Sequence, residues 1–298
     1  MTSADARGAG VDPEQLRTHV RALEGERHPY ASPAALERAV AYVEGQLEGF
    51  GLEVRRHTFQ FRGRSFPNVA GVIPGSDATA PRVLVGAHLD SVRGTPGADD
   101  NASGVAGMLE CARLLVGARP IATIELVGFN LEERQGWTYR VGSRNWAAQA
   151  RREGVRYRGA LILEMVGYRT WEERSQVIPW PIRWMGLPRV GNYLAAVGDG
   201  KSQHLLRTFL EAGAEAVPEL RVVSLHSPLR GWLVWATRRS DNASFWSCGY
   251  PALLLTDTGD LRNPHYHRPS DLVETLDLGF ATDVTDAVVA CVRMLAGA

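Results

Sequence analysis

Histidine and carboxylate residues follow four short apolar segments of this chain, each of which has the pattern of a buried strand. In chain order these residues are His88, Asp90, Asp100, Glu132, Glu133, Glu164 and His267. Ligands in open α/β sheets bind outside the carboxyl ends of the strands, so these side chains are expected to meet at one edge. One such group would mean little, but the same placement at four strands is typical of a metal site.

Five of these residues form a donor set that suits zinc. They supply two imidazoles and three carboxylates, from His88, His267, Asp100, Glu133 and Glu164. Three negative charges and a bridging hydroxide neutralise two divalent ions. Two ions about 3.5–4 Å apart need a bridging carboxylate, and the short side chain of Asp100 suits that role.

The adjacent acids Glu132 and Glu133 suggest a division of labour. Neighbouring side chains in an extended or turning segment point in different directions. One carboxylate can therefore bind a metal while the other takes a proton from a water and passes it to a leaving amine. This pattern indicates metal-assisted hydrolysis.

Each feature also has a simpler structural explanation. A single histidine after a strand is usually a hydrogen-bonded structural residue, and paired acids usually lie in a solvated loop. The run Asp99-Asp100-Asn101 could mark a helix N-terminus, where acids are favoured. These explanations predict no coordination among the four segments, whereas the charge balance of the donor set favours a metal site.

The elements that must position these residues alternate along the chain. Strand-like apolar segments lie at 83–87, 121–129, 160–165, 193–197 and 252–256. Helical spacing occurs at 36–50, 105–115, 143–150, 203–211 and 287–295. The alternation predicts an α/β three-layer sandwich, with a mixed, mainly parallel central sheet flanked by helices. The looser pattern of Leu52–Phe61 predicts an antiparallel edge strand or a hairpin.

We expect a single catalytic domain over residues 12–298, preceded by a disordered leader at 1–11. The run Asp12-Pro13-Glu14 has the residues of a helix N-terminus. A stretch rich in tryptophan and proline, at about 170–190, is expected to be an irregular excursion from this domain.

The composition excludes several classes of protein. With 45% hydrophobic and 22% charged residues, the chain is neither disordered nor collagen-like nor a coiled coil. Basic and acidic residues balance at 33 each, so no global field would attract nucleic acid or an anionic membrane. The longest apolar runs are far shorter than the roughly 20 residues that span a bilayer. Three cysteines without a CxxC motif make a disulfide framework or a cysteine zinc site improbable.

The N-terminal sequence MTSADARGAG lacks the basic and apolar regions of a secretory signal. We therefore expect a cytoplasmic enzyme whose partner is a peptide or small amide substrate. The sequence does not specify an oligomeric state.

Six motifs together resemble the zinc aminopeptidases of metallopeptidase family twenty-eight. They are HLDS at 88–91, GADDNASG at 97–104, EE at 132–133, EMVGY at 164–168, SDNASFW at 240–246 and NPHYHRPSD at 263–271. The resemblance runs from about Leu16 to the C-terminus. The family also holds glutamate carboxypeptidase and is related to the glutaminyl cyclases. The resemblance implies a zinc exopeptidase fold with two Zn²⁺ ions per chain.

The resemblance also implies a role for each ligand. Asp100 would bridge the two metals, His88 and Glu164 would complete one site, and Glu133 and His267 would complete the other. Many members carry aspartate at the position of Glu164, and the metal site is expected to accommodate the extra methylene group of glutamate.

Other residues receive supporting roles by the same resemblance. Glu132 would be the general base, and Asp90 would orient His88, as metal-bound histidines require. Asp241 would support Glu132, and Asp241, Tyr266 and Trp246 are candidates either for supporting the metal ligands or for contact with the substrate.

Two backbone or sequence features complete this comparison. The Ser-Asp-His triplet of many relatives ends in Asn242 here, so any role of its third residue is changed. By resemblance, the peptide bond between Asp100 and Asn101 is expected to be cis.

The leading hypothesis is a zinc-dependent metallo-exopeptidase, specifically a dizinc aminopeptidase acting on free N-termini. One alternative is a glutaminyl-cyclase-like aminoacyltransferase with a single zinc. Another is a non-catalytic binding module of the same fold. The complete set of five ligands favours two metals and hydrolysis.

Overall fold

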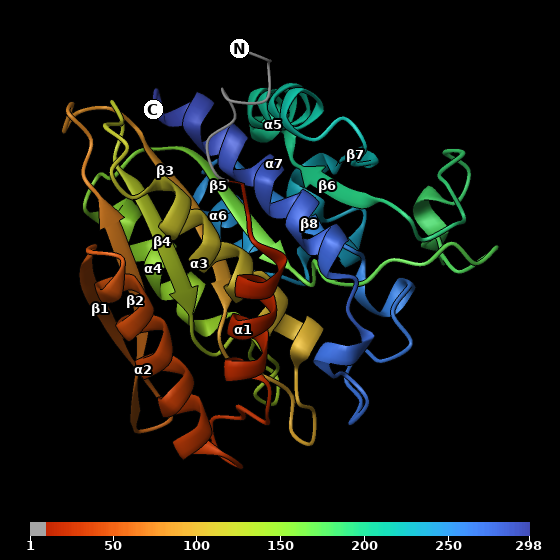
Figure 1. The fold of residues 1–298 in the computed structure, drawn as a ribbon, viewed down its shortest axis with the longest axis horizontal. Coiled ribbons are helices and arrows are strands. Elements are labelled where there is room, and N and C mark those ends of the chain that lie inside the picture. The colour runs from red at the N-terminus through yellow and green to blue at the C-terminus, as the bar shows by residue number, and fades with distance from the viewer. Residues whose placement is uncertain (1–9) are drawn as a thin grey trace.

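One eight-stranded sheet forms the centre of the molecule in the computed structural model, which describes residues 10–298 (Figure 1). The strand order is β1-β2-β4-β3-β5-β8-β6-β7. The strands are β1 Glu53–Phe61, β2 Arg64–Ile73, β3 Arg82–His88, β4 Ile124–Phe129, β5 Tyr157–Glu164, β6 Leu194–Gly198, β7 Val222–His226 and β8 Ala252–Thr256. The pairs β4–β3, β3–β5, β5–β8 and β6–β7 are parallel, and the other three are antiparallel. This confirms the prediction of a mixed, mainly parallel sheet.

Helices cover both faces of the sheet (Figure 1). They are α1 Pro13–Leu23, α2 Pro33–Gly49, α3 Gly104–Leu115, α4 Val141–Arg152, α5 Gln203–Ala216, α6 Asn242–Cys248 and α7 Leu278–Ala296. Buried side chains of α1, α2, α3, α5 and α7 share one hydrophobic core, and those of α4 and α6 share a second. The expected three-layer sandwich is therefore confirmed.

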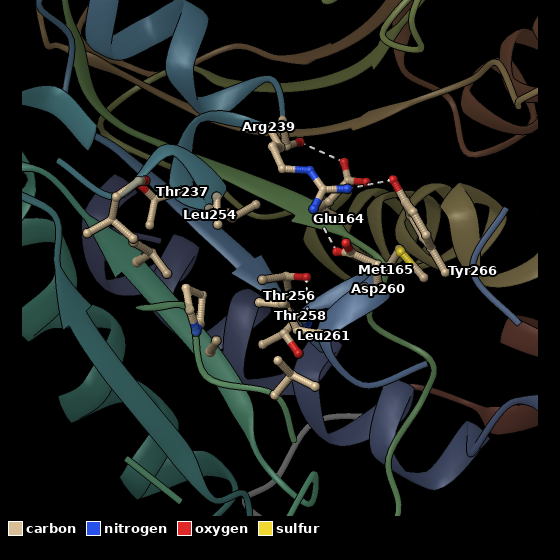
Figure 2. A pocket seen from close by; sticks show the side chains of 18 of the residues that line it. Glu164, Met165, Thr237, Arg239, Leu254, Thr256, Thr258, Asp260, Leu261 and Tyr266 are labelled. Carbon is tan, nitrogen blue, oxygen red and sulfur yellow. Dashed lines mark hydrogen bonds and ion pairs between the residues drawn. The ribbon is translucent and has the colours of Figure 1, made fainter. Parts of the chain in front are cut away.

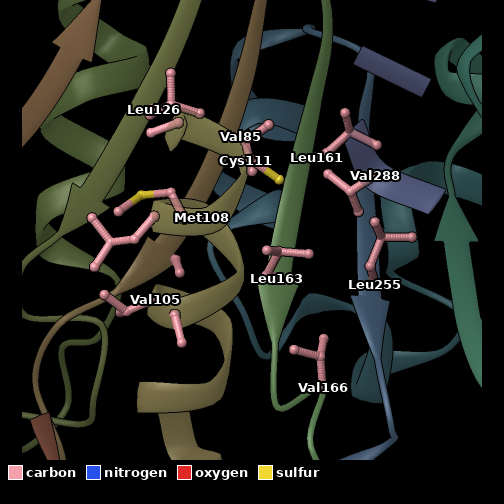
Figure 3. Close-up of a cluster of buried hydrophobic side chains, with 14 of the residues drawn as sticks. Val85, Val105, Met108, Cys111, Leu126, Leu161, Leu163, Val166, Leu255 and Val288 are labelled. Atoms are coloured by element: carbon pink, nitrogen blue, oxygen red, sulfur yellow. The ribbon is translucent and has the colours of Figure 1, made fainter. Parts of the chain in front are cut away.

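Consecutive residues of the central strands enter the two cores in turn. Val83 and Val85 of β3 lie in the first core, and Leu84 lies in the second. Val85 of β3, Cys111 and Met108 of α3, Leu161 of β5 and Val288 of α7 all belong to the first core (Figure 3). Because both faces of these strands are buried, their sequences are continuous apolar runs.

The sequence analysis missed or misplaced several elements. β2 pairs with β1, which confirms the hairpin, but neither β2 nor β7 nor α6 was predicted. The last helix begins at Leu278 rather than near residue 287, because Asp277 caps it by accepting the N–H of Phe280 at 2.9 Å.

The N-terminal end is partly outside the described residues. The expected leader covers residues 1–11, and residues 1–9 of it lie outside the described part of the chain. Within the described part Val11 is buried, and its N–H donates to Asp286 at 3.0 Å. Asp12 then caps α1, as the sequence indicates, by accepting the N–H of Glu14 at 2.9 Å. Among residues 10–298, no helix combines the length and hydropathy needed to cross a membrane.

A buried charge holds α1 against α3. Glu110 accepts hydrogen bonds from Arg113 at 2.7 and 2.8 Å, and His19 of α1 lies 3.7 Å away. Burial alone would raise the pKa of Glu110, but the contacts with Arg113 and His19 outweigh it and lower the pKa to about 2. Because the folded pKa lies below that of the unfolded chain, ionised Glu110 stabilises the fold above about pH 4.5. This contribution is lost as the pH falls through about 2.

Glu110→Gln is expected to lower the free energy of unfolding at pH 7 by up to about 3 kcal/mol. Urea unfolding at pH 7 and pH 3 measures the effect, and the difference from wild type should be smaller at pH 3. Glu14→Gln, which alters an exposed ion pair with Arg17, is the control and should change stability by less than about 0.5 kcal/mol. Equal losses in the two variants would contradict this prediction.

Candidate metal centre

The candidate site lies at the carboxyl ends of the central parallel strands. His88 is the last residue of β3, Glu164 is the last residue of β5, and Glu132 and Glu133 follow β4. Asp100 lies in an irregular helical turn, Ala98–Ser103, that leads into α3. His267 comes from the loop after β8. The strand ends therefore bring together residues from four distant parts of the chain.

One group of donor atoms surrounds Nε2 of His88. This nitrogen lies 3.1 Å from Oδ1 of Asp100 and 3.4 Å from Oε1 of Glu164. These three residues could hold one metal ion. Ligand atoms bound tetrahedrally at 2.0–2.2 Å from zinc are about 3.3–3.6 Å apart, so the observed spacing is close to that of a zinc shell.

A second group surrounds Nε2 of His267. This nitrogen lies 3.1 Å from Oδ2 of Asp100 and 3.3 Å from Oε1 of Glu133. The trio Asp100, Glu133 and His267 could likewise hold an ion. Asp100 thus gives one carboxylate oxygen to each group, which is the arrangement of a bridging ligand.

Several polar atoms of the site have no hydrogen-bond partner. Among residues 10–298, these include the buried atoms Oδ1 of Asp100, Nε2 of His267 and Oε1 of Glu132. Buried polar atoms almost always have partners, so their convergence without mutual hydrogen bonds needs an explanation. Oδ1 of Asp100 belongs to the group around His88, and Nε2 of His267 belongs to the second group, so one cation in each group would satisfy both atoms. The residues present therefore fit a metal.

The charges of the site lead to the same conclusion. Burial would lower the pKa of His267, but contacts with Asp100 and Glu133 raise it to about 10. His88 behaves in the same way: burial opposes its charge, yet Glu164 and Asp100 raise its pKa well above the ordinary value. Burial, followed by the charge of Asp100, raises the pKa of Glu133 to about 7. The carboxylates stabilise positive charge on the two imidazoles, and a bound cation would balance the same negative charge.

Asp90 supports the site differently from the prediction. Its carboxylate accepts the backbone N–H groups of Glu132 at 2.9 Å and Glu133 at 3.1 Å. Nδ1 of His88 instead lies 3.1 Å from the backbone carbonyl oxygen of Asp90, and 3.7 Å from the nearest oxygen of its carboxylate. Asp90 therefore orients His88 through its main chain and fixes the two glutamates through its side chain.

Asn101 links the Asp100 turn to the end of β5. Its side-chain amide donates to the carbonyl of Leu163 at 2.9 Å and accepts the N–H of Met165 at 3.0 Å. A Cβ atom on Gly104 would lie 2.3 Å from Oδ1 of Asn101, so this close approach requires glycine. The peptide bond between Asp100 and Asn101 is cis, as expected.

The chain is constrained beside the candidate residues. Leu131 precedes Glu132, Met165 follows Glu164, and all three of Leu131, Met165 and His267 have left-handed φ angles of 51–56°. Such angles are uncommon outside glycine and cluster at functional sites.

Asp271 holds the turn that carries Asp100. Its buried carboxylate accepts the N–H of Asp99 at 2.8 Å and that of Asp100 at 3.2 Å. Asp271→Asn replaces one accepting oxygen with a donor and is expected to weaken metal binding about 10–100-fold. Competition with a fluorescent chelator measures this affinity. Ser270→Ala, at the exposed neighbour, is the control, and an unchanged affinity in Asp271→Asn would show that the turn does not depend on this contact.

The structure separates the three remaining candidates. Tyr266 stacks on His267, with ring centroids 3.7 Å apart, and lines the cavity beside the site. Asp241 is fully buried, and burial raises its pKa to about 7. Neither of its carboxylate oxygens has a hydrogen-bond partner within the described chain, so the expected hydrogen bond to Glu132 is not formed.

Trp246 is a wrong prediction for a substrate contact. It is completely buried in the second core, and its indole N–H donates to the carbonyl of Ala252 at 2.9 Å. Its position on α6 directs it into the packing against the sheet, and an aromatic residue near a motif does not reveal that direction.

Besides Asn101 and Asp271, two further residues of the site were missed. The hydroxyl of Ser240 donates to Oε2 of Glu164 at 2.6 Å. Arg239 donates to Asp260 at 2.6 Å and to the Tyr266 hydroxyl at 2.9 Å, on the side of the pocket where Glu164 lies (Figure 2). Ser240 is the first residue of the SDNASFW motif, so the motif could have indicated that it lies near the site. No sequence pattern indicates that Arg239 contacts the loop that carries Asp260 and Tyr266.

The fold and the site together define a metallopeptidase-type α/β protein. The chain belongs to peptidase family M28, whose family model matches residues 68–292. It is 32% identical over 290 residues to uncharacterized protein YfbL of Escherichia coli (strain K12), covering 94% of this chain and 87% of that protein.

Solved structures show the same fold. The LapA aminopeptidase of Legionella pneumophila has a TM-score of 0.73 at 19% identity, covering 97% of this chain and 73% of that chain. The glutaminyl cyclase of Fimbriiglobus ruber has a TM-score of 0.72 at 17% identity, covering 99% of each chain. The fold is therefore shared by proteins described as aminopeptidases and as glutaminyl cyclases.

Proposed function

We propose that this chain is a zinc-dependent exopeptidase that carries two Zn²⁺ ions and removes residues from the free N-termini of peptides. The observation that carries the proposal is the position of Asp100, which gives one oxygen to each of two donor groups. Imidazole and carboxylate ligands of this kind suit zinc, and a shared carboxylate suits a pair of ions.

Glu132 is the proposed general base. When bound, the ions would polarise the scissile carbonyl and lower the pKa of a water. Its buried Oε1 has no hydrogen-bond partner among the described residues, so this oxygen is suited to accept the proton of an attacking water. The same carboxyl group can pass that proton to the nitrogen of the leaving amine.

The charge around the site favours recognition of an amine. Glu132 and Glu164 both line the cavity and attract an ammonium group. Of the two arginines that line it, Arg239 is already paired with Asp260 and Tyr266, which reduces its use as a clamp for a C-terminal carboxylate, and Arg134 is exposed.

The test compares three versions of one peptide: free, N-acetylated and C-terminally amidated. We expect release of the N-terminal residue from the free peptide, little or none after acetylation, and almost no effect of amidation. Rapid hydrolysis of the acetylated peptide, or strong loss on amidation, would contradict an aminopeptidase.

Metal content separates the proposal from the cyclase alternative. We expect elemental analysis of zinc-loaded protein to give two ions per chain. One ion per chain, together with conversion of N-terminal glutamine to pyroglutamate and no peptide hydrolysis, would instead identify a glutaminyl-cyclase-like transferase.

A further inference from the structure

A large cavity starts at the candidate metal ligands and continues well beyond them. Its volume is about 630 Å³, and its lining includes Asp100, Glu133 and His267 at one end. Figure 2 shows Glu164 and Tyr266 on one side of this pocket and Thr237 on the other. A continuous space therefore joins the proposed reaction centre to a second compartment.

The floor of that compartment is one face of the sheet. Alternate residues of three strands point into it: Ala195 and Val197 of β6, Val223 and Leu225 of β7, and Leu254 of β8. Elsewhere on this face, α4 and α6 cover the strands. Over β6 and β7 the cover comes from loop residues instead, including Ile178, Ile182, Leu187 and Val234. An apolar sheet face normally packs against another layer of the protein. Over β6 and β7, the cavity separates part of the sheet face from the loops that cover it.

The polar groups around the compartment are already paired with one another. The Gln176 side chain donates to the Thr258 hydroxyl at 2.9 Å and accepts the Nε–H of Arg262 at 2.9 Å. The Thr237 hydroxyl donates to the carbonyl of Val234 at 2.7 Å. These groups therefore have few free hydrogen-bond donors or acceptors for a polar or charged ligand. The side chains of the floor and of the covering loops are mainly apolar.

We infer that the substrate carries, next to the scissile amide, an apolar group larger than any natural aliphatic side chain: an alkyl or arylalkyl group of about eight to twelve carbons. The inference rests on the proposed function and specifies its substrate class. The cavity, which includes the space beside the metal ligands, equals about twenty water-sized volumes, and the four carbons of a leucine side chain would occupy a small part of it.

The loops that form the walls are also apolar on their outer surface. Trp180 and Trp184 belong to the first loop, and Trp232 and Trp235 to the second; their exposures range from 49% to 80%. Trp235 also lines the cavity and lies 5.8 Å from Trp232 between ring centroids. A lipophilic substrate group therefore meets aromatic surface before it reaches the floor.

Two substrate series test the inference on the zinc-loaded enzyme. The first varies the side chain of an amino-acid amide from one to ten carbons, and the second varies the leaving amine of leucine N-alkylamides over the same range. We expect kcat/KM in one series to rise about threefold per methylene beyond four carbons until the cavity is filled. The series that responds identifies the side of the scissile bond that faces the compartment.

Matched variants locate the effect. Val223→Trp, on the edge strand β7, fills the compartment, and Ala195→Phe on β6 does so independently. Both should abolish the gain in kcat/KM with chain length. Ser224→Trp is the control, because it lies on the same strand but points to the other face and is exposed.

A binding measurement distinguishes failure of this inference from failure of the proposed function. Calorimetry compares 2-aminododecanoic acid with alanine on the Glu132→Gln protein, and we expect at least about 100-fold tighter binding of the longer acid. If the longer acid binds tightly, Val223→Trp removes that binding and no amide is hydrolysed, the apolar binding compartment would be supported and the exopeptidase function rejected. Hydrolysis of leucine amides with no gain in either series and no preference in binding would overturn the inference alone.

Discussion

Glu132→Gln is expected to lower turnover by about 10²–10⁴-fold or more and to leave the zinc content unchanged. The amide keeps the size of the side chain but cannot accept a proton. Glu132 is outside the two donor groups that share Asp100, so neither ion depends on it for the proposed coordination. Steady-state kinetics and elemental analysis of the same preparation measure the two effects.

Glu133→Gln is the matched control, because it makes the same chemical change one residue away. Oε1 of Glu133 lies 3.3 Å from Nε2 of His267 in the second donor group. This variant is expected to lose occupancy of one ion. If Glu132→Gln lost zinc and Glu133→Gln kept it, the roles of the two adjacent acids would be reversed.

Asp100→Asn is expected to remove both ions and to reduce activity to background. Both of its oxygens are used, with Oδ1 at 3.1 Å from His88 and Oδ2 at 3.1 Å from His267. An amide offers one oxygen and a donor nitrogen, so neither donor group keeps its full set of ligands. Elemental analysis after dialysis should give much less than one zinc per chain.

His267→Ala is the comparison for Asp100→Asn, since His267 belongs to one donor group only. It is expected to lose one ion and keep the ion beside His88. Two ions retained in Asp100→Asn would reject a bridging carboxylate, and circular dichroism of each variant verifies that its fold is intact.

Much of the candidate site could be predicted because its ligands follow strands of simple pattern. His88 and Glu164 end the buried strands β3 and β5, and the parallel pairing of those strands places their ends at one edge. Residue type then indicates the chemistry, since two imidazoles and three carboxylates suit a pair of divalent ions. The likeness of the motifs to a known family added a separate role for Glu132.

Contacts across distant loops could not be predicted in the same way. Asp90 was expected to hold His88 with its side chain, yet its carboxylate binds the N–H groups of Glu132 and Glu133. Trp246 was expected near the substrate and lies in the core. In both cases the residue type was informative, but the direction of the side chain depended on main-chain geometry that local sequence does not specify.

The fold shows the same division. Apolar strands buried on both faces, such as β3 and β5, were recognised, while β7 was missed because it is a five-residue edge strand with half-exposed residues. The sequence alone determined the layered α/β class and the chemical nature of the site, because hydrophobic periodicity and residue type are local properties. The tertiary structure alone decided that the carboxylate of Asp90 binds the main chain of Glu132 and Glu133 and that a large apolar compartment adjoins the ligands. Both depend on distances between segments far apart in the chain, and only packing sets those distances.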